Sequence, residues 1–189
     1  MIFAASWVAT PWPGEKALHD SLTVIAVTLL CWLGRRLPLP SFIAVLVFLT
    51  LHTIAARWLY SYVPYDQWTL HLFGFRLSEV FGWQRNHFDR LVHFTYGVCA
   101  AVVLQSLFLD RTGWPPARRA LVAVELVIST SAGYELFEWG IAAVLAPDAA
   151  EAYNGQQGDI WDPHKDITLA VLGAVVAVLI GTVRRRVTR

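Results

Sequence analysis

Long apolar runs alternate with shorter polar stretches along the whole chain. A helix that spans a membrane needs roughly 20 mostly apolar residues. Because a helix satisfies its backbone hydrogen bonds internally, apolar runs of this length are predicted to be α-helical. We therefore expect an all-α fold, a polytopic membrane bundle of about five transmembrane helices that forms one domain over residues 1–189. The five runs that reach or approach the required length are residues 17–34, 39–59, 91–109, 120–145 and 167–183.

Two polar stretches are too long to be simple turns. Residues 60–90 mix Trp, Tyr, Phe and His with charged residues, which is typical of an interfacial loop that contains one amphipathic helix. Residues 146–166 form a predicted outer polar loop, and its last part, residues 155–166, reads GQQGDIWDPHKD. Three carboxylates, one histidine and one lysine fall within residues 159–166, so this loop is a dense polar segment between two long apolar runs.

The placement of basic residues predicts how the bundle is oriented. Short loops on the cytoplasmic side of a membrane are enriched in Lys and Arg. With five spans, three basic clusters fall on one side: Arg35 and Arg36, then Arg111, Arg118 and Arg119, then Arg184, Arg185, Arg186 and Arg189. We therefore expect the N-terminus outside and the C-terminus in the cytoplasm.

The composition agrees with a membrane protein. Hydrophobic residues make up 56% of the chain, charged residues only 15%, and the mean hydropathy is +0.48. Soluble domains usually contain about 45–50% apolar and about 25% charged residues. The sequence has no basic face suited to nucleic acid and no phosphate-loop pattern, and Cys31 and Cys99 lie in apolar runs without the spacing of metal ligands. The lipid bilayer is the expected partner, and the oligomeric state is left open.

Acidic and histidine side chains collect near the outer ends of the predicted spans. Asp89 and His93 are four positions apart and Glu135 and Glu138 are three apart, so each pair shares one helix face. His52 falls in the outer part of the second run. A charged Asp in the centre of a lipid-exposed helix costs about 2.5–3.5 kcal/mol. These side chains are therefore expected to face one another, water or a cation.

The outer polar loop leads into the fifth span. Asp162 followed by Pro163 is a typical helix start, and Asp166 falls in the first turn, where the helix dipole favours negative charge. We expect side chains from four helices to converge on one layer at the outer face. They are His52, Asp89, His93, Glu135, Glu138, Asp162 and Asp166.

Each of these residues also has a purely structural interpretation. Asp162 can act only as an N-cap, and Asp166 can act only on the helix dipole. Asp89 can pair with a neighbouring arginine at the surface. His93 can form a hydrogen bond between helices, and Glu138 can lie at headgroup level. The sequence leaves both interpretations open.

Three motifs carry a resemblance to known families: residues 85–94 (RNHFDRLVHF), 134–139 (YELFEW) and 157–162 (QGDIWD) with Asp166. Together they resemble the YjdF-like family of bacterial inner-membrane proteins over about residues 40–183. This resemblance implies the bacterial inner membrane, with a domain of unknown function. The Asp89–His93 element is also similar to the VanZ-like membrane proteins, although Glu138 stands where those proteins have Gln and Ala170 where they have Asn. We treat that likeness as architectural.

The first functional hypothesis is a metal-dependent site that binds or hydrolyses a lipid-linked or headgroup substrate at the outer face. Carboxylates with imidazole suit Zn, Mn, Fe or Mg, and a bound metal can activate water. The expected catalytic residues are Glu135, Glu138 and His93, and His52, Asp159 and Asp162 would support the site. The expected metal ligands are Asp89, His93, Glu135, Glu138 and Asp166.

Two other functions fit the same residues. The protein would be a structural or partner-binding membrane protein if the polar side chains only lock the helices together. It would be a small proton- or ion-coupled transporter if they form a relay. No zincin, cysteine or serine nucleophile motif selects a particular chemistry, so whether the protein is an enzyme stays open.

Overall fold

The computed structural model describes residues 2–144 and 154–187, and these residues contain helices and no strands. Five of the helices are long and apolar enough to cross a membrane, with mean hydropathies of 1.4 to 2.3, which confirms the predicted all-α fold with five spans. The elements are α1 (Ile2–Ala5), α2 (Pro13–Leu33), η1 (Gly34–Arg36), α3 (Leu39–Arg57), α4 (Tyr65–Phe73), α5 (Leu77–Phe81), α6 (Phe88–Leu107), η2 (Leu109–Arg111), α7 (Pro116–Val144) and α9 (Asp162–Val187).

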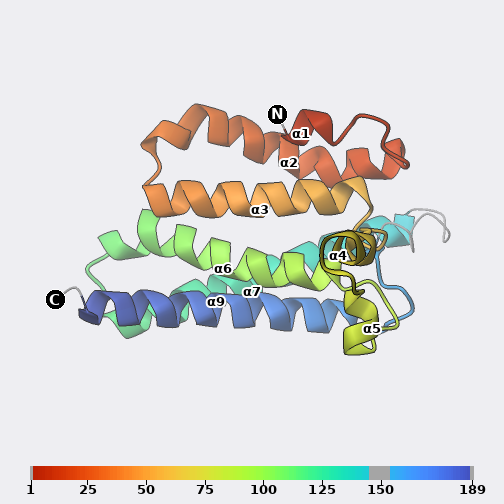
Figure 1. Cartoon of the computed structure of the whole chain (residues 1–189). Helices are drawn as coiled ribbons and strands as arrows, with labels where there is room; N and C mark the ends of the chain where they lie inside the picture. Colours follow the sequence, from red (N-terminus) through yellow and green to blue (C-terminus); the bar gives the residue numbers. More distant parts are fainter. Residues whose placement is uncertain (1, 145–153, 188–189) are drawn as a thin grey trace.

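The five long helices run along one common direction (Figure 1). Helix α2 packs on α3, α3 packs on α6, and α6 packs on α9. Helix α7 contacts both α6 and α9. The short helices α4 and α5 lie together at one end of the bundle, here called the polar end (Figure 1). The last turn of α9, the connection from α2 to α3 and the connection from α6 to α7 lie at the opposite end (Figure 1). That this opposite end faces the cytoplasm stays a prediction.

Two glycines allow α6 and α9 to approach closely. A Cβ on Gly97 would lie 1.8 Å from the carbonyl oxygen of Ala170, and a Cβ on Gly173 would lie 2.1 Å from that of Phe94. Small residues at such positions let two membrane helices bring their backbones together. Because α6 and α9 both start at the polar end, this contact brings the first turns of the two helices side by side.

Several helices start earlier than their apolar runs. α2 begins at Pro13 instead of residue 17, α6 at Phe88 instead of residue 91, and α9 at Asp162 instead of residue 167. Proline fits the first helical turn because its missing N–H has no partner there, and Pro13 and Pro163 both lie in such turns. Hydropathy marks where a helix enters lipid, whereas the helix itself continues into the polar segment.

The two long polar stretches also contain structure. Residues 60–90 hold two short helices, α4 and α5, where one was predicted, and each ends at a left-handed glycine, Gly74 at φ 80° and Gly82 at φ 65°. In the predicted outer loop 146–166, residues 154–161 lead directly into α9. Residue 145 of the predicted fourth span, residues 146–153 of this loop and Arg189 lie outside the described residues.

The packed core is divided along the bundle. At the polar end, Ala55, Val63, Tyr65 and Phe88 belong to one cluster of buried side chains. A second cluster is formed by small and aliphatic side chains of α6, η2, α7 and α9: Ala101, Leu109, Ala123, Val127, Ala170, Ala174 and Val178. The buried acidic side chains described next lie towards the polar end of the bundle.

Candidate metal centre

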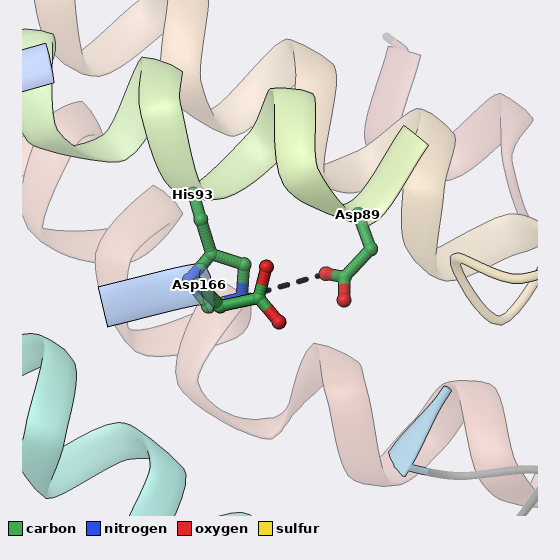
Figure 2. A group of neighbouring side chains, drawn as sticks. All are labelled: Asp89, His93 and Asp166. Atoms are coloured by element: carbon green, nitrogen blue, oxygen red, sulfur yellow. Dashed lines mark ion pairs between the residues drawn. The ribbon is translucent and has the colours of Figure 1, made fainter. Parts of the chain in front are cut away.

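Asp89 and His93 lie in the first two turns of α6 and face the same way. The Nε2 atom of His93 is 3.4 Å from Oδ1 of Asp89 (Figure 2). Both residues are buried, Asp89 at 7% and His93 at 8% exposure. The i, i+4 spacing produces this contact, since residues four apart are neighbours on a helix surface.

Asp166 completes the group from α9. Asp89, His93 and Asp166 each offer one ligand atom, and these three atoms lie within 4.8 Å of one another. Asp166 is only 2% exposed, and its Oδ1 atom is buried without a hydrogen-bond partner. The close α6–α9 contact at Gly97 and Gly173 brings this side chain to the other two.

Glu135 approaches the same imidazole from α7. Its Oε1 atom is 3.8 Å from Nε2 of His93 and is buried without a hydrogen-bond partner. We call Asp89, His93, Glu135 and Asp166 the acidic cluster. Glu138, one turn further along α7, is hydrogen-bonded to Tyr134 and is not in the group with metal-ligand spacing.

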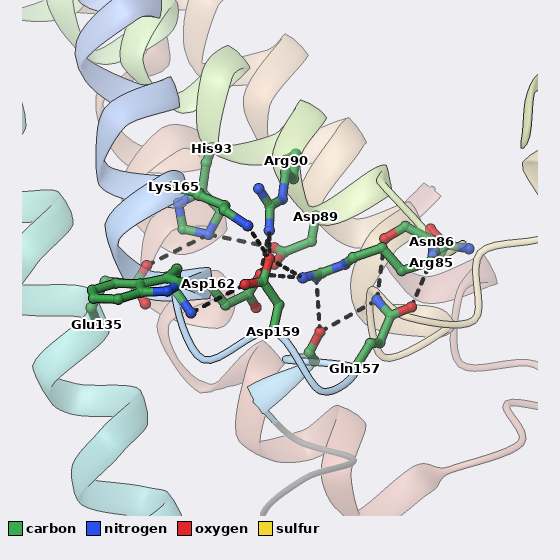
Figure 3. A network of polar contacts seen from close by, with 12 residues as sticks. Arg85, Asn86, Asp89, Arg90, His93, Glu135, Gln157, Asp159, Asp162 and Lys165 are labelled. Atoms are coloured by element: carbon green, nitrogen blue, oxygen red, sulfur yellow. Dashed lines mark hydrogen bonds and ion pairs between the residues drawn. The ribbon is translucent and has the colours of Figure 1, made fainter. Parts of the chain in front are cut away.

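Asp159 and Asp162 belong to a separate ion-pair network with Arg85, Arg90 and Lys165 (Figure 3). Arg90 Nη2 lies 2.7 Å from Asp162 Oδ1 and 2.9 Å from Asp159 Oδ2. Arg85 also pairs with Asp162, and Lys165 Nζ lies 2.6 Å from Asp159 Oδ2. Both arginine side chains are largely buried, at 12% and 14% exposure.

This network corrects two structural interpretations of the sequence. Asp162 is the first residue of α9, but it binds two arginines that are distant in sequence and is therefore more than a cap. The arginines beside Asp89 pair with Asp159 and Asp162. Asp89 has its ion-pair contact with His93 instead. The guanidinium charges near the acidic cluster are thus already bound to other carboxylates.

Amide contacts fasten the same loop to the start of α6. The backbone N–H of Asn86 donates to Oε1 of Gln157 over 2.8 Å, and Nε2 of Gln157 donates to the carbonyl of Asn86 over 3.1 Å. Asn86 Nδ2 donates to the carbonyl of Val63, and Arg85 Nη2 donates to that of Gly155. The loop therefore covers the polar end of α6 and α9.

Two titratable groups outside the spans are shifted. The hydrogen bond from Lys165, together with those from the backbone of Trp161 and from Arg90, holds the pKa of Asp159 below its ordinary value. Burial lowers the pKa of His87, and the charges of Arg90 and Arg85 act in the same direction. Asp159 is therefore the anion that holds Lys165 and Arg90 at neutral pH.

A second polar cluster lies between α2 and α3 at the same end of the bundle. Lys16 and Asp20 form a buried ion pair, with side chains 0% and 2% exposed. His52 is bound at both ring nitrogens, by Thr23 Oγ1 at 2.6 Å from Nε2 and by the Tyr60 hydroxyl at Nδ1. We call Lys16, Asp20, Thr23, His52 and Tyr60 the α2 cluster.

Most of the α2 cluster is not evident from the hydropathy of the sequence. The first apolar run starts at residue 17, so Lys16 falls outside the predicted span, whereas α2 begins at Pro13. Lys16, Asp20 and Thr23 are three to four positions apart, so they share one helix face, and this spacing was the available signal. His52 was predicted to support the site, but its hydrogen bonds place it in the α2 cluster.

The sequence-predicted site residues thus fall into separate groups. The structure brings Asp89, His93 and Asp166 together and places Glu135 beside His93. Glu138 contacts Tyr134, and Asp159 and Asp162 are held in the ion-pair network. A carboxylate-rich set with one imidazole has the donor atoms of a divalent transition-metal site, and among the described residues only Asp89, His93 and Asp166 have the required spacing.

Five apolar helices and a buried acidic layer at one end define a polytopic helical membrane protein. The chain belongs to the family described as "Predicted membrane protein (DUF2238)", whose model matches residues 1–187. It is similar to "Inner membrane protein YjdF" of Escherichia coli (strain K12), with 33% identity over 173 residues that cover 85% of this chain and 78% of that protein. No solved structure matches the chain.

These comparisons confirm the YjdF-like resemblance and a multi-pass protein of the bacterial inner membrane. The likeness to VanZ-like proteins stays a prediction, as do the single domain and the direction in which the termini face.

Proposed function

We propose that the acidic cluster binds a divalent transition-metal cation and uses it to bind or hydrolyse the polar head of a lipid or lipid-linked substrate. The observation that carries the proposal is the three-residue group of Asp89, His93 and Asp166, whose ligand atoms lie within 4.8 Å of one another in a buried position. The unpartnered Oδ1 of Asp166 supports it independently, since a buried polar atom without a partner is costly.

Charge balance supports a cation. Asp89, Glu135 and Asp166 surround one imidazole, and all four side chains are buried. The close ion-pair contacts of Arg85 and Arg90 are with Asp159 and Asp162 and not with these three carboxylates. Several carboxylates in a low-dielectric site need protons or a cation to balance their charge. The donor set of carboxylate oxygens with one imidazole nitrogen suits Zn²⁺, Mn²⁺ or Fe²⁺.

A bound cation supplies electrostatic stabilisation of an anionic oxygen and lowers the pKa of a bound water. Asp89, His93 and Asp166 would hold it. Glu135 would accept a proton from a water that attacks an ester, because its Oε1 atom is close to His93 and is free of other hydrogen bonds. The water oxygen would bond to the carbon or phosphorus of the ester, the bond from that atom to the alcohol oxygen would break, and the leaving alcohol would take up the proton from Glu135.

Metal content tests the proposal directly. The purified protein in detergent is equilibrated with Zn²⁺, Mn²⁺ or Fe²⁺, dialysed and measured by elemental analysis. We expect about one ion per chain for the wild type and loss of that ion in Asp166→Asn and His93→Ala. His164→Ala is the matched control, because His164 lies in the first turn of α9 but is exposed. A wild type without stoichiometric metal, or a folded His93→Ala that keeps it, would contradict the proposal.

A purely structural role is favoured for the ion-pair network but not for the acidic cluster. Arg85, Arg90 and Lys165 tie residues 154–161 to α6 and α9, and their carboxylate partners are close to them. A proton or ion relay has less support. The half of the bundle away from the polar end contains the buried Ala, Val and Leu cluster of α6, α7 and α9 in the part of the chain that the structure describes.

A further inference from the structure

An apolar cavity lies beside the acidic cluster, within the membrane-spanning part of the bundle. Its volume is about 240 Å³, whereas a single water needs only about 10–15 Å³. Side chains of α2, α3, α6 and α7 line it, and much of the wall is hydrocarbon from Leu22, Ala26, Phe48 and Val92. A cavity with such a wall suits an apolar group better than water.

The cavity and the acidic cluster share one residue. His93 lines the cavity and is also in contact with Asp89 and Glu135. Ser131 lines the cavity from α7 and is only 2% exposed. Its Oγ atom is buried and has no hydrogen-bond partner. The side of the cavity near His93 therefore offers polar atoms to a ligand.

The other polar side chains of the wall do not compete for such a ligand. Both ring nitrogens of His52 are engaged, one by Thr23 and one by Tyr60. The hydroxyl of Tyr96 donates to Thr130 over 2.6 Å. Because these groups are paired with one another, a polar head is drawn to the His93 side and the hydrocarbon part to the remaining wall.

The wall of the cavity includes exposed residues of α2 and α7. α2 packs on α3, and α7 packs on α6 and α9, so the cavity lies between α2 and α7. Leu22 of α2 is 53% exposed and Thr130 of α7 is also exposed, and both belong to the wall. These positions lie within the candidate spans, where hydrocarbon surrounds the protein. A lipid chain can therefore enter without crossing water.

We infer that this cavity binds the hydrocarbon chain of a lipid that carries a phosphate head, with the phosphate at the acidic cluster. The inference rests on the proposed cation site, because an anionic oxygen approaches three carboxylates only when a cation lies between them. On α6 the wall extends from Val92 to Tyr96, a rise of about 6 Å. The cavity thus holds the part of one chain next to the head, and the rest of the chain stays in the bilayer.

Photo-crosslinking tests the inference. The Zn²⁺-loaded protein is placed in phosphatidylcholine nanodiscs with one of three probes: phosphatidic acid, a polyprenyl phosphate, or diacylglycerol, each with a diazirine near the head. We expect a phosphate-bearing probe to label the peptides around Ala26 and Thr130 about tenfold more than diacylglycerol, the effect of about 1.4 kcal/mol of head binding. Comparing phosphatidic acid with the polyprenyl phosphate shows which source supplies the phosphate lipid.

A cavity-filling variant and its control sharpen the test. Ala26→Phe places a ring in the cavity and should lower the labelling about tenfold, again about 1.4 kcal/mol. Ala17→Phe, at an exposed position of the same helix, should leave labelling unchanged. Both variants should keep the metal, because neither residue belongs to the acidic cluster. If Ala26→Phe does not fold, the wild-type protein is instead combined with a phosphate-bearing probe whose diazirine is at the end of the chain. This probe should not label the same peptides, because the cavity holds only the part of the chain next to the head.

The outcomes separate the two proposals. Stoichiometric metal with equal labelling by all three probes, or full labelling of folded Ala26→Phe, overturns the lipid inference and leaves the cation site standing. Absence of metal overturns the cation site. Phosphate-dependent labelling that persists in a metal-free wild type would overturn the link between the phosphate and the cation.

Discussion

The acidic cluster and the α2 cluster lie at the same end of the bundle, but their charges are balanced in different ways. In the α2 cluster the ammonium of Lys16 meets the carboxylate of Asp20, and both ring nitrogens of His52 have partners. In the acidic cluster three carboxylates share one imidazole, and oxygens of Glu135 and Asp166 have no hydrogen-bond partner.

The comparison shows that residue type alone does not separate a structural cluster from a binding site. Both clusters contain buried histidine and carboxylate side chains on long helices at the polar end of the bundle. In the α2 cluster the ammonium of Lys16 is paired with the carboxylate of Asp20, and each ring nitrogen of His52 has a hydrogen-bond partner, so its helices are held together without a ligand. The acidic cluster has an excess of negative groups, and a buried excess charge must be compensated. Removing charges should therefore have opposite effects in the two clusters.

The largest effect is expected from Lys16→Met. Removing one partner of a buried ion pair leaves the other uncompensated, which costs about 3–5 kcal/mol. Lys16 is fully buried beneath the rings of Phe3 and Trp7, so water cannot replace it at Asp20. The measurement is the free energy of unfolding in detergent.

Two further variants complete this test. The double variant Lys16→Met/Asp20→Leu should recover most of the loss, because no unpaired charge remains. Lys165→Met is the matched surface control, since Lys165 is 48% exposed and an exposed ion pair contributes only about 0–1 kcal/mol. An equal loss in Lys16→Met and Lys165→Met would refute the structural role of the buried pair.

The next largest effect is expected from Gly97→Ala, which should lower the free energy of unfolding by about 3 kcal/mol or more through overpacking. Its Cβ would meet the carbonyl oxygen of Ala170 at 1.8 Å, and backbone cannot turn aside as a flexible side chain can. Because this contact joins α6 to α9, the variant should also lose the metal while the α2 cluster stays intact.

Gly133→Ala on α7 provides the control for Gly97→Ala. Nothing lies within 4 Å of its added Cβ, and alanine is favoured over glycine in a helix by up to about 1 kcal/mol. Its thermal stability and metal content should therefore equal or exceed those of the wild type. Retention of metal and stability in Gly97→Ala would show that the close α6–α9 contact is not needed for the site.

The difference between the clusters also explains what could be predicted from the sequence. Hydropathy and i, i+4 spacing are local, so the five spans and the Asp89–His93 contact were predictable. Asp166 reaches this pair only because α9 packs against α6. Glycines in the sequence allow a close approach of helices, but they do not show which helix will be the partner. Asp162 looked like a cap because its arginine partners are more than 70 positions away. Lys16 was missed because the helix starts before its apolar run.

Asp166→Asn should change the stability of the metal-free protein in the opposite direction to Lys16→Met. In the metal-free protein it removes one of several like charges, so stability should be equal to or higher than that of the wild type. Adding Zn²⁺ at 100 times its Kd should stabilise the wild type by about 2.7 kcal/mol and should leave Asp166→Asn unchanged. Thermal unfolding with and without the metal measures both effects. Equal stabilisation of wild type and variant would mean that the ion binds elsewhere.

The smallest effect is expected from the pair of Asp159 with the exposed Lys165, at the edge of the ion-pair network. The pKa of Asp159 is held below its ordinary value, first by the hydrogen bond from Lys165. A carboxyl group with a lowered pKa stabilises the fold above its unfolded pKa of about 3.9 and loses this contribution as the pH falls through the folded value. Residues 154–161 should therefore exchange amide hydrogens faster as the pH falls below about 4, once exchange is corrected for its intrinsic pH dependence.

Lys165→Met isolates this contribution from the other titrating groups. Without the ammonium, the pKa of Asp159 moves back towards its unfolded value, so the loop should be less protected at neutral pH and its protection should depend less on pH below about 4. The acidic cluster should keep its metal, because Lys165 contacts Asp159 and not the three ligand residues. A variant with the same pH dependence as the wild type would show that the remaining partners of Asp159, among them Arg90 and Arg85, hold it without Lys165. Loss of metal would show that the loop and the acidic cluster act as one unit.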